Sequence, residues 1–230
     1  MFDLGEVISY LDMCQEEKTH LQRGMNFQLG KTYSVVLMSE RPGAPYEDQT
    51  TDEGKTLIYE GHDMPNRKGG PDPKLVDQPM HNPSGSLCQN GKFYQAAMAN
   101  KKGQEPEIVK VYEKIKSGIW TYNGFFRLVD AWLEEIEGRK VFKFKLELLE
   151  NQKEGKKKEL NNLAHNRVIP SWIKREVWKR DKGKCVKCGS QENLHFDHII
   201  PFSKGGTSID PKNIQLLCAR HNLEKRDKIQ

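Results

Sequence analysis

The sequence has no long apolar run and few cysteines, and both shortages exclude classes of protein. No stretch reaches ~18 uninterrupted apolar residues, so we expect no membrane-spanning helix. Residues 1–6 lack the basic start and apolar core of a secretory signal. Five cysteines in 230 residues are sparse and odd in number, which argues against a secreted disulfide framework. The sequence therefore predicts a cytoplasmic protein without a membrane partner.

The formal net charge of +5 hides an uneven distribution of charge. Residues 151–230 contain 18 Lys and Arg against 9 Asp and Glu, which leaves 19 basic and 23 acidic residues in 1–150. A basic C-terminal third is typical of a protein that binds a polyanion such as nucleic acid. A solvated lysine-rich surface would give the same counts, so charge alone does not decide between the two.

The first 150 residues carry several short β-strand patterns and little helical periodicity. A weak amphipathic helix is expected over residues 6–21, and residues 61–92 have the Gly, Pro, Asn and Asp content of loops. The strand patterns are β-branched or alternating runs at 32–38, 56–59, 108–112, 119–122 and 141–148. Together they predict an α+β protein whose N-terminal domain, residues 1–150, is a curved β-sheet or barrel.

A polar segment separates this domain from the rest of the chain. Residues 151–166 show no apolar period and are interpreted as a linker. A helix is expected from about Pro170 to near Gly183, at the start of a C-terminal domain that comprises residues 167–230.

Two closely spaced pairs of potential metal ligands follow this helix. Cys185 and Cys188 form a C-x-x-C pair, and Cys218 and His221 form a C-x-x-H pair. Three thiolates and one imidazole at this spacing are a donor set for structural zinc. A redox C-x-x-C is the rival interpretation, but the βαβ context of thioredoxin-like sites is missing. In an alternative assignment, the second frame, His221 is a catalytic residue and zinc is bound by the three cysteines alone.

Polar residues of another kind lie between and just after these pairs. The order Asp197-His198, Asn213 and Asn222 resembles the HNH nucleases, whose ββα-metal fold would cover about residues 170–228. The resemblance implies that His198 is the general base and that Asn213 braces its loop. It also implies that Asp197 and Asn222 hold Mg²⁺ or Mn²⁺. Imidazole can take a proton near neutral pH, and oxygen ligands suit a hard cation.

The N-terminal domain resembles the SRA (SET and RING associated, or YDG) domain over about residues 25–150. The similar runs are 31–37, 45–48, 57–61, 119–132 and 138–144, with Asn123 where the YDG motif has Asp. The resemblance implies a PUA-like curved β-barrel that flips 5-methylcytosine or 5-hydroxymethylcytosine out of duplex DNA.

The resemblance also assigns a base pocket. Tyr46 and Tyr59 match the two positions that stack on the flipped base, although ordinary sheet packing is the alternative for both. The acid that meets the cytosine edge would fall at Gln49, with Asp48 beside it, so the sequence leaves both residues open as readers.

The two resemblances together predict a modification-dependent, type IV-like restriction endonuclease. Its expected partner is double-stranded DNA carrying modified cytosine, and its expected cofactors are structural Zn²⁺ and catalytic Mg²⁺ or Mn²⁺. One HNH site cuts one strand, so a double-strand break implies a homodimer, with residues 6–22 as a candidate dimer element. Two alternatives stay open: a non-enzymatic reader of modified DNA, and an HNH nuclease indifferent to modification.

Overall fold

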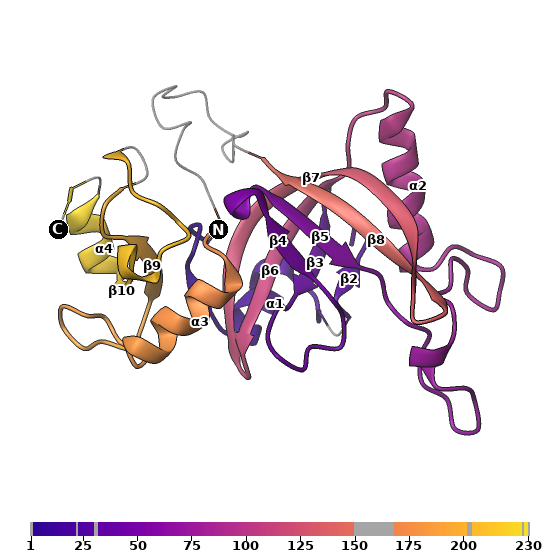
Figure 1. The fold of residues 1–230 in the computed structure, drawn as a ribbon, viewed down its shortest axis with the longest axis horizontal. Coiled ribbons are helices and arrows are strands. Elements are labelled where there is room, and N and C mark those ends of the chain that lie inside the picture. Colours follow the sequence, from indigo (N-terminus) through magenta and orange to yellow (C-terminus); the bar gives the residue numbers. More distant parts are fainter. Residues whose placement is uncertain are drawn as a thin grey trace.

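Strands with a buried face dominate the first two thirds of the computed structural model, and a small unit with two strands and two helices forms the rest (Figure 1). The structure describes residues 2–21, 23–29, 32–149, 168–201, 204–226 and 228–229. The expected linker, residues 151–166, lies outside these ranges. None of the helices in the described ranges is long and apolar enough to cross a membrane.

One twisted sheet forms the N-terminal domain, with the strand order β2-β3-β6-β7-β8-β5-β4 and β1 paired to β7. β3 and β6 are parallel, and the other pairs of this sheet are antiparallel. The strands are β1 (Val7–Ile8), β2 (Met25–Asn26), β3 (Ser34–Met38), β4 (Gln49–Thr51), β5 (Thr56–Glu60), β6 (Ile108–Lys116), β7 (Ile119–Ile136) and β8 (Arg139–Leu148).

The sheet curves but does not close, which corrects the expectation of a barrel. Its two ends, β2 and β4, are not paired to each other. β2 has two residues and β4 has three, so each edge offers few backbone groups with which to complete a ring. β7 bends along its 18 residues, with irregular register against β6 and again against β8, and the sheet wraps around its core as an open half-barrel.

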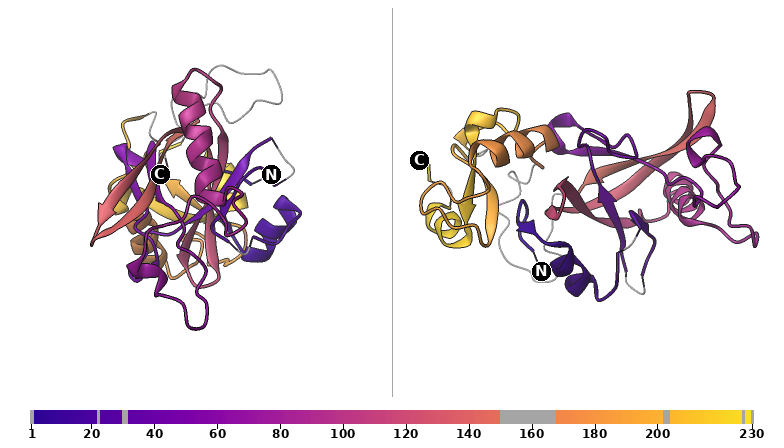
Figure 2. Two further views of the ribbon diagram at one scale, coloured as in Figure 1. Left: turned by 90° about the vertical axis from the view of Figure 1, so that its right-hand side faces the viewer. Right: turned by 90° about the horizontal axis from the view of Figure 1, so that it is seen from below.

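The helices of this domain differ from the expected ones. The stretch 6–21 divides into β1 and the shorter α1 (Tyr10–Glu17), because Ser9 caps the helix and the residues before it pair with β7. α2 (Gln89–Lys101) was not expected, since its first residues resemble the loop that precedes it. Phe93 and Ala97, four residues apart, bury its inner face against the sheet (Figure 2). Two short 3₁₀ turns, η1 (Asp52–Gly54) and η2 (Pro73–Leu75), lie in the loops.

The C-terminal domain is built from α3 (Ser171–Arg180), β9 (Leu194–His198), η5 (Pro211–Asn213), β10 (Ile214–Cys218) and α4 (Ala219–Lys225). β9 and β10 form an antiparallel pair in which Asp197 lies opposite Gln215. A small apolar core joins this pair to α3 through residues such as Ile173, Val177 and Leu216. The strand pair followed by a helix is the ββα arrangement that the sequence predicts for this part of the chain.

A buried ionic network joins the two domains. Lys174 on α3 places its Nζ 2.8 Å from Glu113 Oε2 on β6 and 2.7 Å from Asn123 Oδ1 on β7. Asn123 in turn donates from Nδ2 to the same Glu113 oxygen, at 2.9 Å. Burial raises the pKa of Glu113, but the ammonium of Lys174 outweighs burial and lowers it overall, so the carboxyl group is ionised at neutral pH.

Backbone contacts add to this junction. The Gly5 N–H donates to Tyr122 O on β7 at 2.9 Å, and the Phe196 N–H on β9 donates to Gly5 O at 3.1 Å. The N-terminal segment is therefore hydrogen-bonded to a strand of each domain. At a second point Gly54 lies so close to Val168 that a Cβ would sit 1.8 Å from the Val168 carbonyl oxygen. Side-chain and backbone contacts together fix one domain on the other.

We expect Lys174→Met to destabilise the protein by about 3–5 kcal/mol, because the substitution leaves the Glu113 carboxylate buried without a counter-ion. Urea unfolding followed by circular dichroism measures the change. The double variant Lys174→Met/Glu113→Gln is the control, since it removes both charges and should recover much of the loss. A single variant that unfolds at the wild-type urea concentration would show that the pair does not hold the domains together.

Candidate functional site

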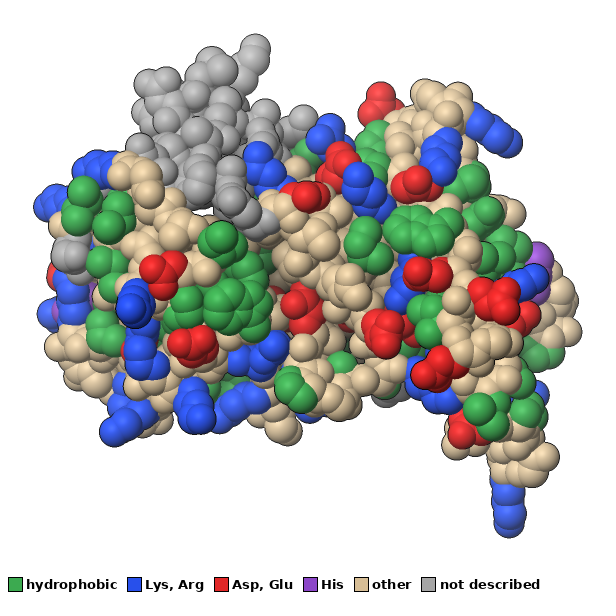
Figure 3. Space-filling view, viewed as in Figure 1, with side chains coloured by type: hydrophobic (Ala, Val, Ile, Leu, Met, Phe, Trp, Pro, Cys, Tyr) green, Lys and Arg blue, Asp and Glu red, His purple; other side chains and the backbone are tan. Residues whose placement is uncertain are grey.

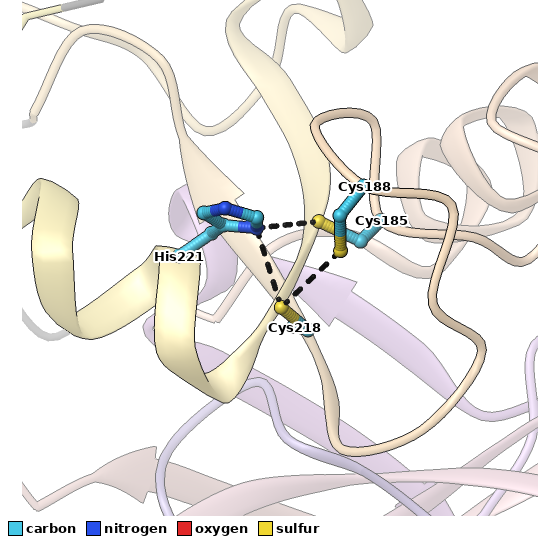
Figure 4. Close-up of side chains that lie close together, drawn as sticks. All are labelled: Cys185, Cys188, Cys218 and His221. Atoms are coloured by element: carbon cyan, nitrogen blue, oxygen red, sulfur yellow. Dashed lines mark hydrogen bonds between the residues drawn. The ribbon is translucent and has the colours of Figure 1, made fainter.

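Four ligand atoms converge at the start of α4 (Figure 4). Cys188 Sγ lies 3.8 Å from Cys218 Sγ, and His221 Nδ1 lies 3.3 Å from Cys185 Sγ and 3.4 Å from Cys218 Sγ. A tetrahedral ion with metal–sulfur bonds of ~2.3 Å and a metal–nitrogen bond of ~2.0 Å would place two sulfurs ~3.8 Å apart and a sulfur and a nitrogen ~3.5 Å apart. The four residues therefore fit one tetrahedral metal ion. His221 points into this cluster rather than toward Asp197, which favours the four-ligand frame over the frame in which His221 is catalytic.

The local backbone prepares one of these thiols, that of Cys185, for a cation. Burial raises the pKa of Cys185, but backbone N–H groups of Cys218, Lys187 and Cys188 donate to its sulfur and lower the pKa to about 6 overall. The thiolate, which is the metal-binding form, is therefore available at neutral pH.

The strand pair places the two residues of the Asp197-His198 motif at the end of β9. His198 is held by a hydrogen bond of 2.8 Å between its Nε2 and Ser208 Oγ. Burial, together with the nearby charge of Lys225, lowers the pKa of His198 to about 4. The imidazole is therefore neutral at pH 7, as a general base has to be.

Asn213 fastens the loop that follows His198. Its Oδ1 accepts from Ile200 N at 2.8 Å, and its Nδ2 donates to Ile200 O at 3.1 Å and to Thr207 O at 2.9 Å. Both ends of the loop are thus tied to one amide. Gly206 lies against the backbone of Ile200, and a Cβ at residue 206 would be 1.8 Å from the Ile200 carbonyl oxygen. This close approach explains the glycine at this position.

The expected Mg²⁺ ligands lie in an environment that the sequence does not reveal. Lys225, which is 1% exposed, places its Nζ 2.9 Å from Asp197 Oδ2 and also donates to the His198 carbonyl oxygen. It is therefore a buried partner of Asp197, although it lies in a basic run of the sequence. Gln215 Nε2 donates to the same Asp197 oxygen at 3.3 Å.

The chemistry of the remaining donors fits a hard cation. Within the described residues, neither Asp197 Oδ1 nor the Asn222 side chain forms a hydrogen bond or ion pair with the protein. A carboxylate and an amide oxygen are donors that Mg²⁺ accepts. Asn222 lies in α4 one turn before Lys225, and the described contacts do not join its side chain to Asp197.

A cavity of about 670 Å³ opens in the N-terminal domain, and three of the four expected pocket residues line it. These are Tyr46, Asp48 and Tyr59. Gln49 is an exposed residue of β4 and does not line the cavity. Asp48 is buried, with Oδ2 accepting from Ser39 N at 2.9 Å and Oδ1 accepting from Glu60 N at 3.0 Å. Burial raises the pKa of Asp48 to about 7, so its carboxyl group is partly protonated at neutral pH.

A further aromatic residue of this cavity, His62, is not among the residues predicted from the sequence. Its ring stacks on Tyr46 with a centroid distance of 5.1 Å and an interplanar angle of 15°, and its Nε2 lies 3.1 Å from the Tyr59 hydroxyl. Burial lowers the pKa of His62 to about 4, so the ring is neutral. Asn90 on α2 holds the His62 backbone with two hydrogen bonds of 2.8 Å. His62 follows the end of β5 by two residues, and its closeness to a predicted strand that carries Tyr59 is the sequence signal that points to it.

Comparison with known families defines the class of protein. The family model of the SAD/SRA domain matches residues 5–152, and that of the HNH endonuclease matches residues 185–228. The chain therefore belongs to the SAD/SRA family and carries an HNH endonuclease domain at its C-terminal side. Both resemblances that the sequence indicates are confirmed at the level of the family.

The relatives differ in how much of this chain they match. "Histone-lysine N-methyltransferase family member SUVH9" of Arabidopsis thaliana is 30% identical over 144 residues, which cover 59% of this chain and 20% of that protein. The SUVH5 SRA domain, solved with hemi-methylated CG DNA, is 24% identical with a TM-score of 0.45 and covers 68% of this chain and 94% of that one. The phosphorothioation-dependent type IV restriction endonuclease ScoMcrA is 14% identical with a TM-score of 0.45, and the match covers 99% of this chain and 56% of that one.

Cys185→Ser should abolish metal binding at the cluster and unfold the C-terminal domain while the N-terminal sheet stays folded. The core of the small domain is too limited to compensate for a metal whose binding contributes about 10 kcal/mol to folding in comparable sites. Elemental analysis of purified protein, together with limited proteolysis, measures both effects. Cys14→Ser is the matched control, because Cys14 lies on α1 outside the cluster. A folded Cys185→Ser domain without metal would contradict a structural role for the cluster.

Proposed function

We propose that the protein is a modification-dependent DNA endonuclease that holds a flipped, modified cytosine in the N-terminal cavity and hydrolyses a phosphodiester at the HNH site. The observation that supports it most is the presence in one chain of an SRA domain with an aromatic-lined cavity and an HNH domain with a neutral, oriented histidine. A non-enzymatic reader would have no need for an HNH domain with a neutral, oriented histidine. 5-Methylcytosine and 5-hydroxymethylcytosine are the bases we propose for the cavity.

In the proposed reaction, His198 takes a proton from the attacking water while Ser208 and Asn213 keep its ring and loop in place. Asp197 and Asn222 would hold Mg²⁺ or Mn²⁺, which supplies a Lewis acid that stabilises the charge developing on the phosphate and on the departing 3′ oxygen. The cluster of Cys185, Cys188, Cys218 and His221 is proposed to hold structural Zn²⁺. A double-strand break needs two such sites, so we infer that two copies of the chain act together.

In the base pocket, Tyr46 and His62 supply aromatic faces and Asp48 supplies a carboxyl group. We assign the reading of the cytosine edge to Asp48, because Gln49 lies outside the cavity. A protonated carboxyl group donates to N3 of cytosine while its carbonyl oxygen accepts from N4, and an ionised one can only accept. Tyr59, whose side chain is buried, forms the wall behind His62.

Cleavage of one DNA fragment in four forms tests the proposed function. With Mg²⁺ or Mn²⁺ present, we expect cutting of the 5-methylcytosine or 5-hydroxymethylcytosine form and none of the unmodified form, with glucosylated DNA as the fourth substrate. His198→Ala should abolish cutting and leave binding of modified DNA intact, because the ring acts on water and not on the flipped base. Equal cutting of all four forms would remove the reader from the proposal. Tight binding of one form without any cutting would leave a non-enzymatic reader.

The assignment of Asp48 predicts a pH dependence of binding. The neutral carboxyl group is the form that donates to cytosine, so affinity for modified DNA should decrease as the pH rises through about 7. Asp48→Asn should remove this dependence, because an amide does not ionise. Gln49→Ala is the matched control and should keep both the affinity and its pH dependence. Fluorescence anisotropy of a labelled duplex from pH 6 to 8.5 measures the affinity of the parent protein and of the two variants. Loss of binding in Gln49→Ala would reverse the assignment.

A further inference from the structure

A basic groove lies at the junction of the two domains, beside the base cavity and separate from it. It encloses about 450 Å³ between the end of β6 and the outer face of α3. Four of its six lining residues are cationic, and one apolar and one aromatic residue complete it: Ile115, Lys116, Arg175, Trp178, Lys179 and Lys182. Figure 3 shows Lys and Arg side chains gathered along the lower edge of the C-terminal lobe, where α3 lies.

The described part of the chain does not balance the charges of the four cations of the groove. Across the described ranges, no carboxylate forms an ion pair with Lys116, Arg175, Lys179 or Lys182. Arg175 also has a buried Nη1 that makes no hydrogen bond. Buried donors are normally satisfied, so an unpaired guanidinium nitrogen beside three ammonium groups indicates a site for an anion.

The groove is organised rather than a chance collection of surface lysines. Lys116 of the N-terminal domain lies over the ring of Trp178 of the C-terminal domain, with its Nζ 5.6 Å from the ring centroid. Gly183 has a φ of +63°, and a Cβ there would meet the Trp178 ring at 2.7 Å, so this residue lets the chain pass behind the indole. Because the ionic network of Lys174 fixes α3 on β6, the cations from both domains keep one arrangement.

The same hairpin forms a wall of the base cavity. Lys114, Gly118 and Trp120 of the β6–β7 hairpin line the cavity, whereas Ile115 and Lys116 line the groove. The register of β6 against β7 is irregular between Lys114 and Lys116, so the alternation of side chains is broken there and one hairpin contributes residues to both sites. A duplex whose base entered the cavity would therefore bring its backbone phosphates close to the groove.

We propose that this groove binds the phosphate backbone of the duplex that the cavity reads, and so guides it from the reader toward the HNH domain. The inference rests on the proposed function, because it takes the occupant of the cavity to be a base of that duplex. Lysine and arginine contacts of this kind position DNA without reading its sequence. The groove should therefore add affinity for modified and unmodified DNA alike and add nothing to the discrimination between them.

The test compares the double variant Lys116→Gln/Lys179→Gln, one lysine from each domain, with the charge-matched control Lys102→Gln/Lys140→Gln. All four lysines are exposed, and neither control residue lines the groove: Lys102 is the C-cap residue of α2 and Lys140 lies in β8. Both are made in the His198→Ala background to prevent cleavage. Anisotropy of two labelled duplexes, one with a central 5-methylcytosine and one unmodified, is recorded over a series of NaCl concentrations.

We expect the groove variant to lose about tenfold in affinity per lost phosphate contact at ~0.1 M salt, for both duplexes, with the slope of log affinity against log salt reduced by about 2. The control should keep the slope of the parent. An unchanged slope in the groove variant would overturn the inference and leave the proposed function standing. Equal affinity of the parent for both duplexes would instead count against the proposed reader, while a reduced slope would still support the groove.

Discussion

The buried ion pair between Lys174 and Glu113 is the contact on which the arrangement of the two domains depends. Both side chains are 1% exposed, and a charge withdrawn from water without its partner costs several kcal/mol. If the two domains separated, Lys174 and Glu113 would each lose the partner that now balances its charge. Asn123 completes the network, since its amide donates to Glu113 and accepts from Lys174. A carboxylate at this position, as in the YDG motif, would face the Glu113 carboxylate and repel it, so the departure from the motif has a structural reason.

This docking links the two sites through packed elements. β6 carries the Glu113 carboxylate and, a few residues later, leads into the β6–β7 hairpin, which contributes residues to both the base cavity and the basic groove. α3 carries Lys174 toward the sheet, while Arg180 at its other end donates to Pro211 O and Ile214 O beside the nuclease strands. The relation between the cavity and the HNH strands is thus determined by folded contacts as well as by the length of the segment between the domains.

The parts predicted from sequence are those whose geometry is local. The ligands of the metal cluster come in pairs three residues apart, and a turn or a helix start brings such pairs together whatever the rest of the fold does. The order of Asp197, His198 and Asn213 likewise follows one hairpin. His62, Lys225 and α2 were missed or misplaced because their roles depend on long-range packing: His62 stacks on a residue from another loop, and Lys225 reaches back to β9 from α4. The prediction of a closed barrel was wrong for a similar reason, because spacing along the chain does not show whether the two edge strands of the sheet pair with each other.

The small C-terminal domain depends on two separate supports. Its apolar core lies mainly between α3 and one strand pair, and the buried residues of α4 are the polar His221 and Lys225. The cluster of Cys185, Cys188, Cys218 and His221 ties α4 to the turn after α3, and the ionic network ties α3 to the sheet. His198 lies between these two anchors, on the strand that also bonds to the N-terminal segment. The orientation of the proposed general base therefore depends on the metal-ligand cluster and on the ionic network together. These two supports let a domain of this size hold a neutral imidazole in one position.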